Sequence, residues 1–159
     1  MSISDHIVVM CAGVLQQSGK PQTVYDDPVN LFCAKFLGTP PINVFHGNVR
    51  SGVLYLGGAA VLSVTGVRDG DVTVGIRPEG FVLDEGGAFV CAKRSVEVMG
   101  RDVSVVAAHP AIEGESGTLR AIIPSDSAVT GETVRFSLKA RKVHLFDPAD
   151  GERLRFTEG

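Results

Sequence analysis

From Asn43 onward the sequence is a series of short apolar segments broken by glycine-rich turns, and this pattern restricts the fold more than any other feature. In residues 133–140 (TVRFSLKA) polar and apolar residues alternate without exception, as in a half-buried strand of an antiparallel sheet. Further strands are predicted at Val44–Arg50, Val53–Leu56, Ala60–Val64, Val72–Arg77, Phe89–Val98, Val103–Ala108, Thr118–Ile123 and Val143–Phe146. The turns between them are expected at Gly57-Gly58, 69–71, Gly86-Gly87, 100–102, 114–117 and 125–131. Short strands at this spacing predict a mainly β fold, a closed or nearly closed antiparallel barrel.

The first 38 residues follow a different pattern. An apolar run at 7–10, followed after Ala12-Gly13 by Val14–Gln17, predicts a small hairpin that turns at 11–13. Pro21 opens a short helical turn through Tyr25, which we expect to be weak because Lys20 is a poor N-cap.

A second helix is predicted to begin at Asp27, as N-cap, with Pro28 in the first position. Its apolar residues recur at helical spacing and predict one buried face: Val29, Phe32, Cys33, Phe36 and Leu37. Gly38 follows as a C-terminal glycine, and Thr39-Pro40-Pro41 reads as a stiff linker. The sequence therefore divides into residues 1–38 and a barrel domain at 39–159.

Composition argues against several classes of protein. The net charge of -3 and the presence of only ten aromatic residues (8 Phe, 2 Tyr) disfavour nucleic-acid binding. No run of 18 apolar residues predicts a membrane span, and no signal peptide is indicated. The cysteines, Cys11, Cys33 and Cys91, are odd in number and widely spaced, so buried free thiols are favoured over a zinc site or a disulfide framework.

The usual motifs of catalysis and phosphate binding are not found. At Gly19-Lys20 a P-loop would need a glycine where Val14 stands and a hydroxyl where Pro21 stands. The four histidines, His6, His46, His109 and His144, lack metal-ligand spacing, and no G-x-S-x-G string occurs. The carboxylates at 69–71 and 84–85 are interpreted as solvated turns. No catalytic, cofactor-binding or metal-binding residue is predicted in this chain.

Several strings, in order along nearly the whole chain, resemble the C-terminal part of one protein family. They are residues 4–21 (SDHIVVMCAGVLQQSGKP), Val24–Pro28, Phe32–Gly38, Pro41 with Asn43, 74–79 (VGIRPE), 96–100 (VEVMG), and Val143–Asp147 with Gly151. The family is the ATP-binding subunits of ABC importers for carbohydrates, glycerol phosphate, polyamines and related solutes. Each string alone is short, but their order and spacing together are specific.

The resemblance implies that residues 1–38 close a nucleotide-binding domain and that 39–159 form an OB-fold-type regulatory barrel of the TOBE or MOP-like kind. The family's Walker A, Q-loop, signature, Walker B and switch histidine all precede the aligned part, and His6 is not that switch histidine. No ATP-hydrolysis residue therefore carries over to this chain, although the intact subunit would be an ATPase using ATP and Mg. The chain is expected to be a C-terminal piece: an engineered fragment, a proteolytic product, or a start assigned to an internal methionine.

Two functions from different classes follow from the resemblance. The leading one is a regulatory and dimerisation module of a sugar-type importer ATPase. Its partners would be a second copy, the membrane permease subunits through the intact ATPase, and a regulatory protein or small ligand, at the cytoplasmic face of the membrane. The alternative is a module binding a molybdate-like oxyanion, for which Ser95, Ser104, Thr118 and Lys93 are candidates. An unrecognised enzyme is disfavoured because no pocket motif is present.

Two structural expectations complete the prediction. The string Arg77-Pro78-Glu79 is interpreted as architectural, with Pro78 ending a strand. The apolar helix face of the first 38 residues should be covered, either by the chain's own barrel or by a second copy, with Phe32 and Phe36 buried.

Overall fold

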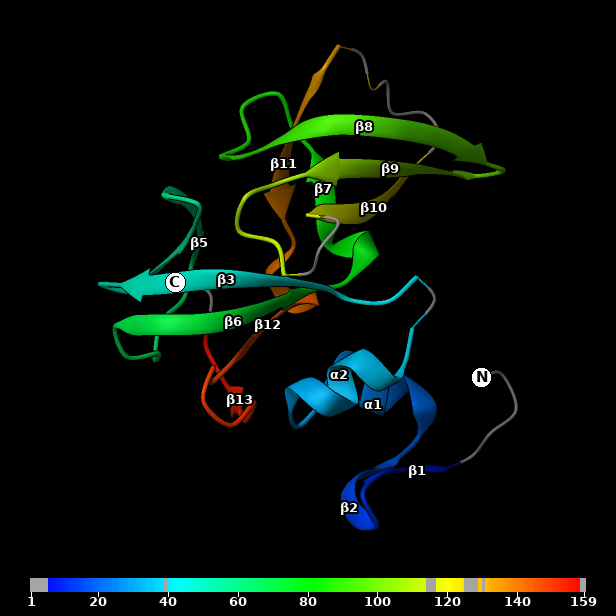
Figure 1. Cartoon of the computed structure of the whole chain (residues 1–159), viewed down its shortest axis with the longest axis vertical. Coiled ribbons are helices and arrows are strands. Elements are labelled where there is room, and N and C mark those ends of the chain that lie inside the picture. The colour runs from blue at the N-terminus through cyan, green and yellow to red at the C-terminus, as the bar shows by residue number, and fades with distance from the viewer. Residues whose placement is uncertain (1–5, 39, 114–116, 125–128, 130, 158–159) are drawn as a thin grey trace.

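The computed structural model describes residues 6–38, 40–113, 117–124, 129 and 131–157 (Figure 1). The N-terminal segment, residues 6–38, holds β1 (Ile7–Cys11), β2 (Val14–Gly19), α1 (Pro21–Asp26) and α2 (Leu31–Phe36). The first half of the barrel holds β3 (Asn43–Arg50), β4 (Val53–Leu56), β5 (Ala59–Ser63), β6 (Gly70–Ile76), the 3-10 turn η1 (Pro78–Gly80) and β7 (Phe81–Leu83). The second half holds β8 (Phe89–Met99), β9 (Asp102–Ala108), β10 (Thr118–Pro124), β11 (Thr133–Leu138), η2 (Ala140–Lys142), β12 (Val143–Phe146) and β13 (Arg153–Leu154).

The strands of the barrel form two antiparallel sheets. One has the order β13-β12-β6-β3-β4-β5 and the other the order β10-β9-β8-β11-β7. Their inner faces share one apolar core, in which Phe45 of the first sheet meets Phe89 of the second edge to face at 5.5 Å. The predicted mainly β fold, an OB-fold-type antiparallel barrel with a short N-terminal hairpin and one or two short helices, is confirmed, and the helices are two.

The alternating pattern locates the strands because one face of each is buried. In β11, Val134 and Phe136 are buried while their polar neighbours Thr133 and Arg135 are exposed, as the sequence predicts. Each of the nine strands predicted after Asn43 has its counterpart within two residues at each end. The strands β7 and β13 were not predicted, because three-residue and two-residue strands are too short to show a period.

The turns expected at 114–117 and 125–131 fall mainly on residues 114–116, 125–128 and 130, which lie outside the described residues. Thr39 of the expected linker and residues 1–5 lie outside them too. Among the described residues, no helix has the length and apolar content needed to cross a membrane.

The prediction for the second helix is wrong in two respects. The helix begins after Asn30, whose side-chain oxygen accepts from the Cys33 N–H at 2.9 Å, and not after Asp27. Its buried side is formed by Cys33 and Ala34, while Phe32 and Phe36 are 40% and 55% exposed. The later start is favoured because the Asp27 carboxylate is held by two arginines from the other end of the chain.

Candidate functional site

No group of three or more His, Cys, Asp or Glu side chains in the described ranges is placed to hold a metal ion. Burial raises the pKa of Cys33, and it raises that of Cys91 to about 12. These two thiols therefore stay protonated and unreactive at neutral pH. The feature that organises the molecule is instead the junction between the N-terminal segment and the barrel.

Arg77 is the centre of this junction. Its side chain is buried, with 1% of the residue exposed, although it carries a charge. Nη1 donates to the carbonyls of Ala34 and Leu37, each at 2.9 Å, and Nη2 donates to the carbonyl of Tyr25 at 2.8 Å. These carbonyls lie toward the C-terminal ends of α1 and α2, where backbone acceptors lack partners within the helix. One guanidinium from the barrel therefore caps both helices, and its positive charge suits the negative ends of their dipoles.

The position of Arg77 in the chain directs its side chain to the helices. The residue directly follows β6 and precedes Pro78, which cannot donate in a sheet and restricts Arg77 to an extended backbone. The Arg77 N–H donates to the carbonyl of Lys142 at 3.2 Å, so its backbone is fixed against η2. The planar guanidinium then lies over the Tyr25 ring, 4.0 Å from its centroid.

Glu79 and Lys142 complete the junction around the same tyrosine. The Tyr25 hydroxyl donates to the Glu79 carboxylate, 2.7 Å from Oε2 and 2.9 Å from Oε1. Burial, and then the bond to Glu79, raise the pKa of Tyr25, so the hydroxyl keeps its proton. Lys142 Nζ lies 3.6 Å from Asp26 and 3.9 Å from Glu79. The predicted architectural role of Arg77 and Glu79 agrees with these contacts, but their shared partner Tyr25 gave no signal in the sequence.

The C-terminal end of the chain closes the junction from another side. Arg153 and Arg155 both donate to Oδ1 of Asp27, at 3.0 and 2.7 Å, and Arg153 also donates to the Pro28 carbonyl at 2.7 Å. The Leu31 N–H donates to the Gly151 carbonyl at 2.9 Å. The bond from Arg155 is the main cause that lowers the pKa of Asp27. Residues more than a hundred positions apart thus hold the start of α2 in place.

The residues considered for an oxyanion site are spread along three strands. Ser104 is opposite Ile122, four positions along β10 from Thr118, and accepts from Arg120 Nη1 at 2.7 Å. Lys93 and Ser95 flank a bulge in β8, where Ser95 is exposed. The strand register does not bring these four side chains into one group.

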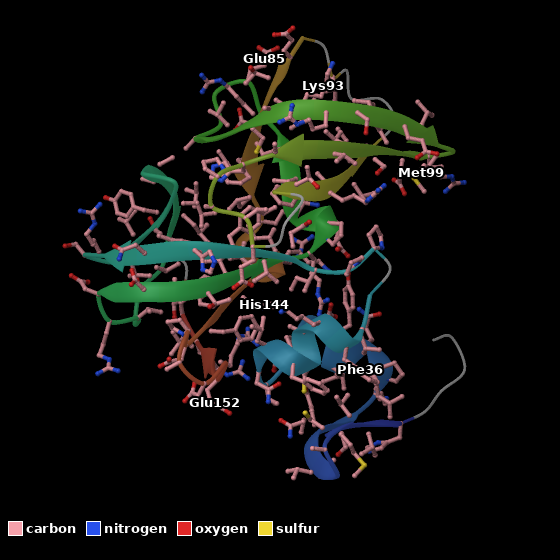
Figure 2. The ribbon with its side chains drawn as sticks, viewed as in Figure 1. Phe36, Glu85, Lys93, Met99, His144 and Glu152 are labelled. Atoms are coloured by element: carbon pink, nitrogen blue, oxygen red, sulfur yellow. The ribbon has the colours of Figure 1, made fainter. Side chains whose placement is uncertain are left out.

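The N-terminal segment exposes several apolar side chains. Val8 and Met10 of β1, Val14 and Leu15 of β2, and Phe32 and Phe36 of α2 are all exposed. We call these six residues the outer apolar face. Phe36 lies far from Glu85 and Lys93 at the other end of the molecule (Figure 2). Neither it nor Phe32 is covered by the chain's own barrel, which makes that half of the burial prediction wrong.

Comparison with known proteins shows which class of protein this chain is similar to. The chain is similar to ATP-binding subunits of ABC importers and matches their C-terminal part. The relatives include proteins named sn-glycerol-3-phosphate import ATP-binding protein UgpC, from Ruegeria sp. (strain TM1040), Paracoccus denitrificans and Agrobacterium fabrum. Their identities to the chain are 32% over 155 residues, 33% over 157 and 36% over 167. The matches cover 97%, 97% and 100% of this chain but 43%, 44% and 43% of the relatives, so the chain spans less than half of their length. No protein-family model matches the chain.

Proposed function

We propose that this chain is the regulatory and dimerisation part of the ATP-binding subunit of an ABC importer. Residues 39–159 would form the regulatory barrel, and residues 1–38 would complete the nucleotide-binding domain. The observation that carries the proposal is the match to the C-terminal part of such subunits over 97% of the chain.

The names of the relatives suggest which solute the intact importer carries. Because they are named for import of sn-glycerol 3-phosphate, we propose this phosphoester or a related solute as the cargo of the intact importer. The intact subunit would hydrolyse ATP with Mg, and would work as a pair of copies with permease subunits at the cytoplasmic face of the membrane. The residues that perform hydrolysis would lie in the part of the subunit outside this chain.

The outer apolar face supports this division of the chain. Six exposed apolar side chains on a short hairpin and helix leave a surface that water disfavours. In an intact subunit, the rest of the nucleotide-binding domain would pack against this face. Arg77 would then connect that domain to the barrel, because movement of α1 or α2 is transmitted through its three carbonyl bonds.

A chimera tests the proposal. Residues 1–159 would replace the matched part of the Agrobacterium fabrum relative, whose match covers the whole chain. We expect Mg-dependent ATP hydrolysis by the chimera and no saturable binding of Mg–ATP by the chain alone. A folded chimera without ATPase activity, beside an active intact relative, would contradict the proposal, as would micromolar ATP affinity of the isolated chain.

A matched pair of variants in the chimera tests the regulatory role. Arg77→Ala should change the rate of hydrolysis while leaving the affinity for ATP unaltered, because Arg77 connects the barrel to the helices. Arg94→Ala, an exposed arginine on β8, should leave both unchanged. Equal behaviour of the two variants would argue that the barrel has no influence on the ATPase.

A further inference from the structure

A cleft rich in arginine lies beside the junction, where residues 153–157 meet α1, η2 and β12. It has a volume of about 370 Å³ and is lined by parts of α1, η2, β12 and residues 153–157. Its charged side chains are Arg141, Arg153, Arg155 and Asp26, and His144 forms part of its wall. We call it the C-terminal cleft; His144 and Glu152, labelled in Figure 2, mark the β12 and β13 sides of this region.

The positive charge of the cleft is incompletely neutralised. Arg153 and Arg155 share one carboxylate oxygen, Oδ1 of Asp27. Asp26 is already engaged, since its carboxylate lies 3.6 Å from Lys142 Nζ and accepts from Gln22 at 3.0 Å. Arg141 is exposed, and its guanidinium makes no hydrogen bond or ion pair with the described residues. Among the described residues, three guanidinium groups therefore line one cleft, and Asp27 is the carboxylate that pairs with two of them.

Two buried polar atoms in the wall also lack partners among the described residues. They are Nδ1 of His144, a residue that is 2% exposed, and Nε of Arg153. A buried polar atom without a partner is costly, and its presence in a folded protein calls for an explanation. Burial, and then the positive charges of Arg153 and Arg77, lower the pKa of His144, which agrees with a positive field at this wall.

We propose that the C-terminal cleft binds a phosphate group, either free phosphate or the end of a small phosphomonoester. Arg141 and Arg155 would contact the phosphate oxygens at the mouth, and the charge of Arg153 would lie beneath them. The forked guanidinium group suits a tetrahedral oxyanion, which can accept from several arginines at once. The site is separate from Ser95, Ser104, Thr118 and Lys93, none of which lines this cleft, and it goes beyond the importer function proposed above.

Titration calorimetry of the full chain with inorganic phosphate tests the proposal at pH 7.5 and constant ionic strength. We expect saturable heat with phosphate and none with chloride. Arg141→Gln should weaken phosphate binding about 3- to 10-fold, as expected when one guanidinium contact is lost at a partly exposed site. Because Arg141 holds no other part of the chain, this variant should remain folded. Arg94→Gln is the control, since it removes one exposed positive charge from the distant β8 and should leave the affinity unchanged.

Titration with phenyl phosphate distinguishes the two sources of the group. If phenyl phosphate binds more tightly, the cleft also contacts the organic part of the ligand, and a phosphomonoester is the ligand. If inorganic phosphate binds more tightly, the free ion is the ligand. The absence of saturable binding with both ligands overturns the proposal. So does an equal loss of affinity in Arg141→Gln and Arg94→Gln, because general charge attraction would then explain the heat.

Discussion

The barrel and the N-terminal segment are stabilised in different ways. The barrel has one continuous core to which both sheets contribute, and its inward residues are almost wholly buried. The N-terminal segment has two small groups of buried residues: Val9, Val24 and Cys33 pack together, and Ala34 with Leu31 packs against Ile42, Val44 and Phe146 of the barrel. Its larger apolar side chains are exposed. Polar contacts with the barrel add to this small apolar contact: Arg77 donates to carbonyls near the helix ends, and Arg153 donates to Asp27. We infer that the barrel folds by packing of its own core, and that the segment depends on the barrel through hydrogen bonds and one small apolar contact.

The largest effect is expected from Gly87→Ala, which tests the barrel's reliance on close packing. A Cβ at Gly87 would collide with the backbone carbonyl of Phe136 and approach the Asp84 carbonyl to 2.9 Å. Backbone atoms of β11 cannot yield without disturbing the core, so the free energy of unfolding should fall by about 3 kcal/mol. Urea unfolding followed by circular dichroism measures the change. Gly86→Ala is the control, because its Cβ would meet only Asp84 Oδ1 at 3.6 Å; equal stability of the two variants would refute the packing argument.

The second effect is the loss of stability caused by Arg77→Ala, which should be confined to the N-terminal segment. The change leaves three backbone carbonyls without their donor and removes the ring contact with Tyr25, which should cost about 2 to 3 kcal/mol. Hydrogen exchange should accelerate in residues 21–37 and change little in β3, β6 and β11. Uniform acceleration over the whole chain would contradict the division into two regions. Arg94→Ala should leave the exchange of both regions unchanged.

The sequence revealed the barrel better than the segment for a physical reason. In a strand with one buried face, every second residue is apolar, so Val134 and Phe136 could be predicted to be buried without knowledge of the neighbouring strands. A six-residue helix has less than two turns, and its apolar spacing does not say which side meets a partner. Phe32 and Phe36 are larger than Cys33 and Ala34, yet the smaller pair is buried, because β1, β2 and the barrel lie on that side.

The junction could be predicted only in part. The string Arg77-Pro78-Glu79 was recognisable, since a proline at a strand end has a mechanical role. Its partner Tyr25 lies far away in the sequence, and so does Arg153, which fixes another part of the junction at Pro28; no local pattern connects these positions. The Asp27-Pro28 pair resembled a helix start, but Asp27 accepts from Arg153 and Arg155 instead of capping.

The third effect is a loss of stability in acid, and it tests the burial of His144 in β12 near the junction. The folded chain lowers the pKa of His144 to about 3, from an ordinary value of 6.5. Below pH 6.5 the His144 side chain takes up a proton in the unfolded chain but stays neutral in the folded chain. The free energy of unfolding is therefore at its full value above pH 6.5 and decreases as the pH falls toward 3. The loss between pH 8 and pH 5 should be about 2 kcal/mol. Burial lowers the pKa of His109 in the same direction, so it adds to the loss.

Urea unfolding at pH 8 and pH 5 measures this acid loss. The His144→Gln variant should lose less stability between the two pH values than the wild type, whatever its absolute stability. The His46→Gln variant should behave nearly like the wild type, because that side chain is 67% exposed and its contact with Glu113, at 3.5 Å, is a surface ion pair of small energy. A wild-type chain equally stable at both pH values would contradict the burial of a neutral histidine.

The smallest effect on stability is expected from a change in the outer apolar face. This change tests whether two copies of the chain pair through the N-terminal segment or through the barrel. We expect the chain to form a two-fold dimer through Phe32 and Phe36, because self-complementary contacts are the commonest way to cover such a surface. Phe36→Asp should abolish the dimer in light scattering while changing the stability of the single chain by less than about 0.5 kcal/mol, since the side chain is 55% exposed. Val98→Asp, on the β8–β9 hairpin, is the matched change in the barrel, where the side chain is 72% exposed. If Val98→Asp dissociates the dimer and Phe36→Asp does not, copies associate through the barrel; a monomeric wild type would show that neither surface pairs in solution.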